Sequence, residues 1–263
     1  MKPGDGAASE ARLPTGAASR GPLRSAVGTP VRTASVTVAG GFIALLACLV
    51  VLGLLAESIR DREVIVLDTL ATPFLHGLAS PILDGLMQAA TFIGSNLAIP
   101  PLFAIATIWL ILAHRPREAL FLAIGCGGSL VLNELMKVFF ARPRTQLAWA
   151  QVMPDYSFPS GHTMNSLVFY VALALVVWSV IGRRAGLASL AAAIVLTVLI
   201  GVSRIYLGYH YLTDVDGGLL AGTAWFLIVA GAFRAGPLSR LGRHAAVVRA
   251  ADRSVPRSTQ EES

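Results

Sequence analysis

The sequence predicts an all-α membrane protein, a bundle of six transmembrane helices. Hydrophobic residues make up 55% of the 263-residue chain and charged residues only 14%, a balance that does not suit a soluble domain. The apolar residues are also gathered into runs that approach or exceed the roughly 20 residues that a helix needs to cross a bilayer. The number of these runs therefore predicts the number of transmembrane helices.

The two ends of the chain differ from its middle. Residues 1–35 are rich in Gly, Ala, Ser, Pro and Arg, and residues 235–263 return to Arg, Ser and Pro with little apolar content. Such segments bury too little apolar surface to offset the entropy lost on ordering. We expect both to be disordered basic tails, with residues 36–234 forming one six-helix transmembrane domain.

The apolar runs give six spans, at residues 36–56, 83–113, 118–140, 163–181, 185–202 and 215–233. A cleaved signal peptide is the alternative for the first run, but no clear small-residue cleavage site follows it. The second run is too long for one straight crossing, and we expect Pro100 and Pro101 to bend it or to mark a shorter core.

Residues 57–81, between the first two spans, carry an amphipathic pattern. Apolar side chains recur there at helical spacing, namely Val64, Leu67, Leu70, Phe74 and Leu78. This pattern is typical of a helix that lies along the membrane interface.

The basic residues orient the bundle. The formal charge of +6 arises from short clusters between apolar runs, a pattern typical of membrane topology, so no nucleic-acid partner is expected. Six spans put 15 of the 21 Lys and Arg residues on the side of the tails. Both termini are therefore expected to be cytoplasmic, in a multi-pass protein of the plasma membrane. Cys48 and Cys126 lie inside apolar runs without metal-type spacing.

Polar residues gather at the ends of the third and fifth spans and at the start of the fourth, all on the outer side, where they point to function. The first segment, residues 137–145, contains Lys137, Arg142, Pro143, Arg144 and Thr145. The alternative for Lys137 is a purely structural role, because the long side chain of a lysine at the end of an apolar helix can place its ammonium group in the membrane interface.

The second segment is Phe158-Pro159-Ser160-Gly161-His162, directly before the fourth span. Free backbone N–H groups at a helix start converge on anions, and the helix dipole adds to the attraction. His162 would then stand beside a phosphate cradle. The alternative is a simple helix cap.

The third segment joins the fifth and sixth spans and contains Ser203, Arg204, His210 and Asp214. If the turn around His210 is helical, Asp214 lies one turn further on and can hold one imidazole nitrogen. The other nitrogen is then a free nucleophile. Asp216 is a near neighbour, but the four-residue spacing selects Asp214.

Together the three segments resemble the type 2 phosphatidic acid phosphatase (PAP2) family, the membrane lipid phosphatases that share a site with vanadium haloperoxidases. The family pattern is Lys, six residues, Arg-Pro; then Pro-Ser-Gly-His; then Ser-Arg, five residues, His, three residues, Asp. One position departs, because Thr145 stands where the family has proline. That proline stiffens a turn, so activity is expected to survive, and Arg142 is a possible auxiliary to Arg144.

The resemblance implies the roles of the site residues. Lys137, Arg144 and Arg204 bind the phosphate together with Ser160 and Gly161. His210 attacks phosphorus, Asp214 orients it, and His162 protonates the leaving oxygen and then activates water. No metal or other cofactor is expected, because the three cations supply the charge that magnesium supplies elsewhere.

Other functions stay open at this point. A phosphotransferase would pass the phosphate to a hydroxyl acceptor, a haloperoxidase would bind vanadate, and a non-catalytic protein would only bind an anion. The partners expected are the bilayer and a lipid phosphate, namely an isoprenoid diphosphate, phosphatidic acid or phosphatidylglycerol phosphate. The isoprenoid diphosphate of the cell-envelope carrier cycle is favoured.

Overall fold

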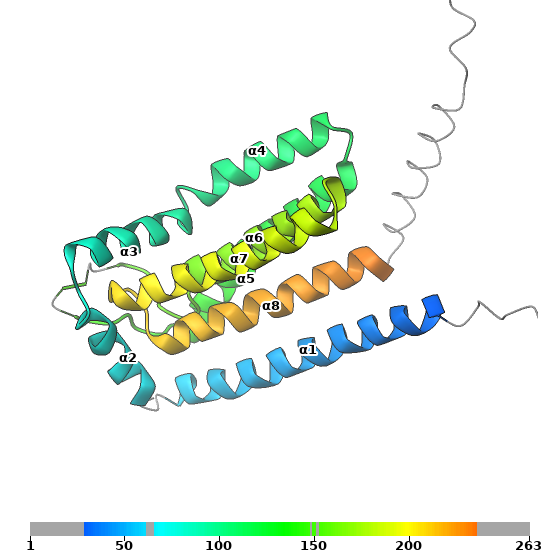
Figure 1. Ribbon diagram of the computed structural model, residues 1–263. Coiled ribbons are helices and arrows are strands. Elements are labelled where there is room, and N and C mark those ends of the chain that lie inside the picture. The colour runs from blue at the N-terminus through cyan, green and yellow to red at the C-terminus, as the bar shows by residue number, and fades with distance from the viewer. Residues whose placement is uncertain (1–28, 62–65, 148, 151–152, 236–263) are drawn as a thin grey trace, which may run out of the picture. The chain divides into compact units, whose positions relative to one another are not determined.

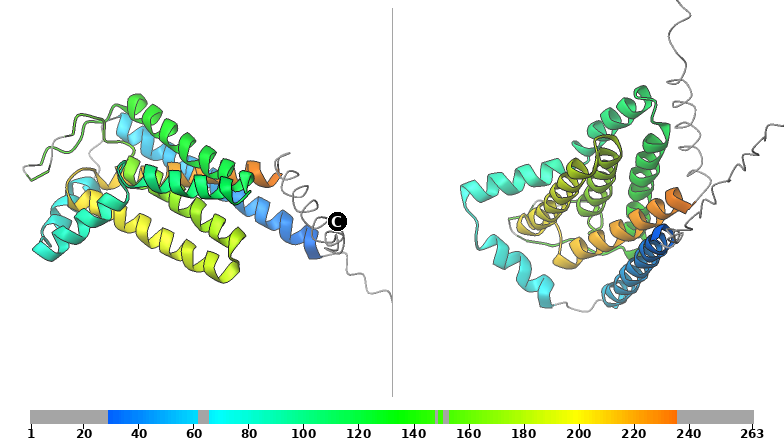
Figure 2. Two further views of the ribbon diagram at one scale, coloured as in Figure 1. Left: turned by 90° about the horizontal axis from the view of Figure 1, so that it is seen from above. Right: turned by 45° about the vertical axis from the view of Figure 1, so that its right-hand side comes forward.

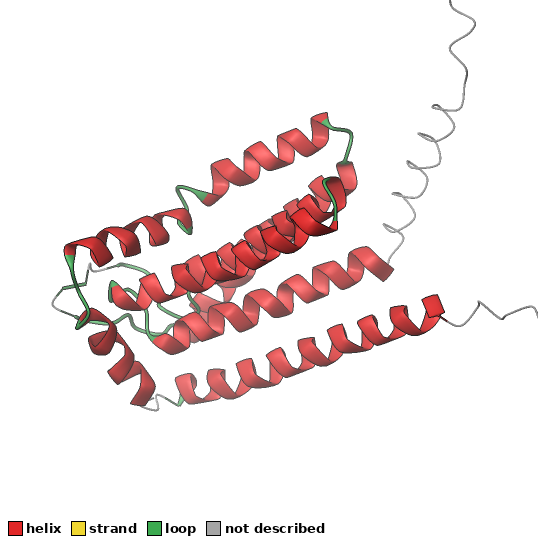
Figure 3. Ribbon diagram, in the orientation of Figure 1, coloured by secondary structure: helices red, strands yellow, loops and turns green. Residues whose placement is uncertain are grey.

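The computed structural model describes residues 29–61, 66–147, 149–150 and 153–235, and in these ranges all of its regular secondary structure is helix (Figures 1 and 3). The all-α prediction is thus confirmed for the described residues. The helices are α1 (Thr29–Arg60), α2 (Val66–His76), α3 (Pro81–Ile93), α4 (Ile99–Leu112), α5 (Pro116–Phe140), α6 (Gly161–Val180), α7 (Arg183–Tyr206) and α8 (Leu212–Ala235).

The first and last helices test the expected tail boundaries. Helix α1 begins at Thr29, so residues 29–35 are helical and the tail boundary expected at residue 35 is wrong. The described residues before Val38 are the opening turns of α1. The rest of both expected tails, residues 1–28 and 236–263, lies outside the described residues.

Five of the described helices are long and apolar enough to cross a membrane, which makes the chain a multi-pass membrane protein. They are α1 over Ala39–Arg60 and the four helices α5 to α8. Large apolar side chains such as Leu135, Val138 and Val195 are more than 60% exposed, as lipid-facing residues are. Between the helices, Leu122, Phe169 and Val176 are buried in a common core.

The second expected span is wrong as one continuous helix. The chain breaks at residues 94–98 between α3 and α4, which have 13 and 14 residues. Pro100 lies in the first turn of α4, where proline is tolerated because the first N–H groups of a helix have no partner inside it. The prolines therefore begin a helix and do not bend one. Figure 1 shows α3 and α4 following one another along the bundle.

Helix α2 confirms a helix within the amphipathic segment. Leu67, Leu70 and Phe74 are at least 60% exposed, whereas Asp68 and Thr72 on the other face are buried. Val64 lies outside the described residues.

The four helices α5 to α8 place the polar segments together (Figures 1 and 2). Helix α6 packs against α5, α7 and α8, and successive helices run in opposite directions. The ends of α5 and α7 therefore meet the starts of α6 and α8, which brings the three polar segments to one end of the bundle.

Candidate active site

Three cationic side chains come from separate elements and meet at this end of the bundle. Lys137 lies in the last turn of α5, Arg144 follows that helix, and Arg204 lies in the last turn of α7. Helix α7 runs to Tyr206, four residues beyond the expected span, so Arg204 is held on a helix with only 3% exposure. Its guanidinium lies 4.2 Å from the ring centre of Tyr209, and its Nη1 donates to Thr91.

His210 makes two contacts that together fix its tautomer. Its Nδ1 lies 3.3 Å from Oδ2 of Asp214, and its Nε2 lies 3.2 Å from Nη1 of Arg144. Because an arginine only donates, Nε2 must accept, so the proton of the neutral ring is on Nδ1 and points to the carboxylate. The lone pair of Nε2 therefore faces the cationic side chains.

The turn that carries His210 is not helical, so the helical condition considered for the pairing with Asp214 is not met. The residue lies in the turn between α7 and α8, and α8 begins at Leu212. The backbone N–H groups of Tyr209 and His210 both donate to the carbonyl of Arg204, which closes the turn. The predicted pairing with Asp214 is formed all the same.

The environment of His210 keeps its ring neutral. The pKa of His210 is lowered from 6.5 to about 4, chiefly because of burial, and the charges of Arg204 and Arg144 contribute in the same direction. The hydrogen bond and charge of Asp214 act against them. At neutral pH the ring is therefore unprotonated, the state that a nucleophile needs.

The turn before α6 is tightly enclosed by α5 and α8. A Cβ on Gly161 would lie 2.7 Å from Oδ1 of Asn133, and a Cβ on Gly218 would lie 2.7 Å from the carbonyl oxygen of Ser160. The backbone N–H of Ser160 donates to the carbonyl of Asp214. The start of α6 is thus packed directly against the start of α8, with a cis peptide between Phe158 and Pro159 just before it.

His162 lies in the first turn of α6 and is half-buried. It is within electrostatic reach of His210 and of all three cations, Lys137, Arg144 and Arg204. The structure therefore brings together both predicted histidines, the predicted aspartate and the three predicted cations.

Asp155 is a part of this site that the sequence analysis missed. Its Oδ2 lies 2.6 Å from Nζ of Lys137, and its Oδ1 lies 2.7 Å from Nη2 of Arg144. Burial raises its pKa, but the two cations outweigh burial and hold the pKa below its ordinary value. A charged carboxylate thus bridges two of the three cations.

Arg142 does not join the other cations. Its Nη1 lies 2.5 Å from Oδ1 of Asp214, and its Nη2 lies 2.8 Å from Asp68 on α2. Thr145, at the position of the departing residue, donates from its hydroxyl to the carbonyl of Gly208, two residues before His210. Both side chains therefore hold parts of the site in place.

The grouped side chains suit an anion better than a metal ion. Lys and Arg offer only N–H donors, and hard cations prefer oxygen ligands. In the described ranges, no three His, Cys, Asp or Glu side chains are placed to hold a metal.

A model of the PAP2 superfamily matches residues 118–235, the range from α5 to α8 that carries all of the site residues predicted from the sequence. Phosphatidylglycerophosphatase B of Bacillus subtilis is 28% identical over 181 residues, which cover 68% of this chain and 89% of that protein. The undecaprenyl-diphosphatase BcrC of Bacillus subtilis is 29% identical, over 56% of this chain and 74% of that protein.

A solved structure is also similar. The crystal structure of a transmembrane PAP2-type phosphatidylglycerolphosphate phosphatase from Bacillus subtilis aligns with a TM-score of 0.67 and 27% identity. The alignment covers 71% of this chain and 94% of that one.

Proposed function

Because the chain belongs to the PAP2 superfamily and is a membrane-embedded phosphatase, we propose that it releases phosphate from a lipid through a phosphohistidine on His210. The observation that carries the proposal is the position of His210 between Asp214 and Arg144. One ring nitrogen is held by a carboxylate, and the other presents its lone pair toward the cations that would bind a phosphate.

In the first step the phosphate would bind among Lys137, Arg144 and Arg204. Phosphoryl transfer depends mainly on positioning and on stabilising charge at the equatorial oxygens, and arginines do both through paired N–H groups. The Nε atom of Arg204 is buried and has no hydrogen-bond partner among the described residues, so a donor is left for a substrate oxygen. Ser160 and the backbone of Gly161 would complete this site at the start of α6.

Transfer would then proceed in two steps. Nε2 of His210 forms a bond to phosphorus while the bond from phosphorus to the lipid oxygen breaks, and His162 gives that oxygen its proton. Asp214 stabilises the positive charge that develops on the ring of His210. In the second step His162 takes a proton from water, the water oxygen bonds to phosphorus, and His210 leaves neutral.

The membrane placement follows from the helices and the charges. We infer that α3 and α4 together make the sixth crossing, which returns both termini to one side. The positive-inside rule then places the termini in the cytoplasm and the site at the outer face of the plasma membrane. A site at the interface suits a lipid headgroup, whose acyl or isoprenoid chain stays in the bilayer.

The substrate proposed is a lipid with a terminal phosphate monoester or diphosphate. The two named relatives act on different members of this class, a phosphatidylglycerophosphate and an undecaprenyl diphosphate, and both lipids present a terminal phosphate. The isoprenoid diphosphate remains the favoured substrate, and phosphatidic acid is the third candidate.

The test is phosphate release by detergent-purified protein from these three lipids in the presence of EDTA, beside the His210→Ala variant. The proposal expects release from at least one lipid by the wild type and none by the folded variant. Equal release by both proteins would contradict a histidine nucleophile. Transfer of the phosphate to an alcohol acceptor, without release of free phosphate, would favour a transferase.

A further inference from the structure

Three charged side chains, two of them buried carboxylates, form a chain that leads from α2 to the nucleophile. Arg142 lies between two carboxylates, with Nη2 2.8 Å from Oδ2 of Asp68 and Nη1 2.5 Å from Oδ1 of Asp214. The Asp68 and Asp214 side chains are 4% and 0% exposed. A buried pair of this kind is strongly coupled, because removing one partner leaves the other unpaired in a medium of low dielectric constant.

Asp68 also holds the start of α8. Its Oδ1 accepts from the backbone N–H of Thr213 at 2.9 Å, and its Oδ2 accepts from the Thr213 hydroxyl at 2.6 Å. Thr213 directly precedes Asp214 in the first turn of α8, where backbone N–H groups have no partner inside the helix. A carboxylate from α2 therefore caps the helix that carries Asp214.

The carboxylate of Asp214 divides its two oxygens between different tasks. Oδ1 faces Arg142, while Oδ2 faces Nδ1 of His210 and accepts the backbone N–H of Tyr211 at 3.0 Å. Arg142 thereby fixes the carboxylate plane in which Oδ2 meets the imidazole. The positive charge of Arg142 also weakens the electrostatic stabilisation that Asp214 gives to the imidazolium. The negative charge of Asp68 offsets this effect.

We propose that Asp68 and Arg142 are positioning residues for phosphoryl transfer, which hold the carboxylate of Asp214 in the orientation that His210 requires. The inference rests on the proposed function of His210. Helix α2 is then part of the catalytic apparatus, although none of the three sequence segments of the site includes it.

The partial burial of Arg142 supports this assignment. Its side chain is 14% exposed, and its guanidinium lies 4.3 Å from the ring centre of Tyr211. Burial opposes its charge, but Asp214 and Asp68 outweigh burial and raise the pKa of Arg142 above its ordinary value. The cation is thus held charged between its two partners.

The test compares Asp68→Asn with Asp61→Asn on the lipid that the wild type hydrolyses. Asparagine keeps the size of the side chain and an oxygen for Thr213 but removes the charge, and Asp61 is an exposed acid shortly before α2. We expect kcat of Asp68→Asn to fall roughly 100-fold, the scale of a small misplacement in an active site. We expect its KM to stay within about twofold, because Asp68 touches no phosphate-binding cation.

The pH profile separates positioning from a structural role. Without the charge of Asp68, the positive charge of Arg142 acts on Asp214 alone and neutralises more of its negative charge. The protonated ring of His210 is then less stabilised against Arg144, Arg204 and the neighbouring His162, so the pKa of His210 falls. The acid limb of kcat/KM in Asp68→Asn then moves to lower pH, whereas Asp61→Asn keeps the wild-type profile. The inference would be overturned if folded Asp68→Asn had the wild-type kcat and the wild-type acid limb of kcat/KM. Loss of activity in His210→Ala would in that case still support the proposed function.

If Asp68→Asn does not fold, Arg142→Lys decides. Lysine keeps the charge but lacks the planar fork that reaches both carboxylates. The inference expects a loss of kcat with little change of KM, and an unchanged kcat would contradict it. Inactive wild type on every lipid would instead count against the proposed function.

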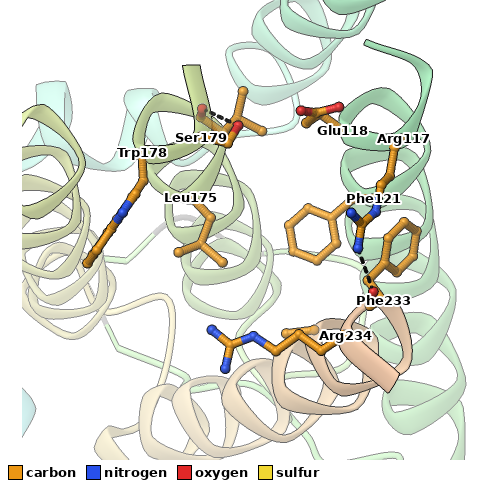
Figure 4. A pocket seen from close by; sticks show the side chains of 10 residues that line it. Arg117, Glu118, Phe121, Leu175, Trp178, Ser179, Phe233 and Arg234 are labelled. Carbon is orange, nitrogen blue, oxygen red and sulfur yellow. Dashed lines mark hydrogen bonds between the residues drawn. The ribbon is translucent and has the colours of Figure 1, made fainter. Parts of the chain in front are cut away.

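A separate cavity of about 380 Å³ lies at the other end of the bundle, between α5, α6 and α8 (Figure 4). Arg117 and Arg234 lie at its edge, and Phe121 and Leu175 face one another across it. Arg117 lies 20 residues before Lys137 on α5, so the cavity and the site are about 30 Å apart, close to the thickness of a bilayer core.

The charged side chains around this cavity indicate which kind of ligand would bind in it. Glu118 is paired with Arg115 at 3.1 Å, and Arg117 donates to the carbonyl of Phe233. Arg234 makes no hydrogen bond or ion pair within the described part of the chain. A cationic edge above an apolar cavity between membrane helices matches an anionic headgroup and its acyl chain. We propose that an anionic phospholipid of the leaflet opposite the active site binds here.

Native mass spectrometry of the detergent-purified protein tests this second site. Phosphatidylglycerol and phosphatidylcholine with the same acyl chains are titrated in the presence of inorganic phosphate, which competes at the catalytic cations. The wild type should prefer phosphatidylglycerol about fivefold, the effect of one cation near a membrane surface, and Arg234→Gln should lose this preference. Arg184→Gln, at the same end on α7, should keep it. No preference in the wild type, or equal loss in both variants, would contradict the site.

Discussion

Nδ1 of His210 lies 3.3 Å from Oδ2 of Asp214, and both side chains are at most 1% exposed. The histidine is outside α8 and the aspartate is in its first turn, so the contact joins a turn to a helix start. Buried polar groups without partners are costly, and each of these two satisfies the other. The pair therefore keeps one orientation of the imidazole before any phosphate arrives.

We predict that Asp214→Asn lowers kcat roughly 10³- to 10⁴-fold, the scale seen when a carboxylate that orients a catalytic histidine becomes an amide. The amide can present its NH2 group to Nδ1, which would move the ring proton to Nε2 and remove the nucleophilic lone pair. Steady-state kinetics with the folded variant measure this change in kcat. A loss of less than about tenfold would mean that the orientation of His210 comes from elsewhere.

We predict that Asp155→Asn tightens phosphate binding. The carboxylate of Asp155 bridges Lys137 and Arg144, the cations that the substrate would use, so it competes with the phosphate. The inhibition constant of inorganic phosphate and the KM for the lipid should both fall in the variant. Weaker binding of phosphate would show instead that Asp155 holds the cations in place. The Glu134→Gln variant is the control, because Glu134 lies further from Lys137, at 3.6 Å, and is largely exposed.

The sequence predicted the local features of this site. The two histidines, Asp214 and the cations lie in short segments at the ends of helices, where polar residues interrupt apolar runs, and the structure brings them together. Asp68 and Asp155 were missed because each is a single carboxylate whose role depends on a distant partner. Asp68 meets Thr213 across 145 positions of the chain, and no spacing within a segment encodes such a contact.

The break between α3 and α4 was missed for a related reason. Hydropathy is continuous from residue 83 to residue 113, but a Cβ at Gly94 would lie 2.6 Å from Ile200 of α7 and 2.9 Å from Ser166 of α6. The chain thus turns where it is pressed against two other helices. A hydropathy pattern records which residues are apolar and carries no record of this packing.

We predict that acid destabilises the wild type more than the His210→Gln variant. Folded His210 has a lowered pKa of about 4, whereas the unfolded residue binds a proton near pH 6.5. The contribution of neutral, buried His210 is complete above pH 6.5 and is lost as the pH falls toward 4, because only the unfolded chain takes up the proton there. Thermal unfolding in detergent at pH 7.5 and pH 5 should show the larger decrease in the wild type. Equal decreases would mean that His210 titrates normally.

We predict that Gly218→Ala destabilises the fold by about 1–3 kcal/mol and lowers activity, as inserting a methyl group into a packed interface does. The added Cβ would lie 2.7 Å from the carbonyl oxygen of Ser160 and would push α8 away from the turn before α6. Gly231→Ala on the same helix is the control, since a Cβ there meets no atom within 4 Å. Thermal unfolding and phosphate release of both variants check this, and equal behaviour would contradict the close packing.

The central claim is that phosphate passes through Nε2 of His210. The most direct measurement is mass spectrometry of the His162→Ala variant, quenched at alkaline pH, where phosphohistidine survives, during reaction with p-nitrophenyl phosphate, whose leaving group needs no proton from His162. Without His162 to activate water, phosphate should accumulate on His210, and the label should be absent from the His162→Ala, His210→Ala double variant. Continued phosphate release with no label on His210, or a label on another residue, would contradict the mechanism.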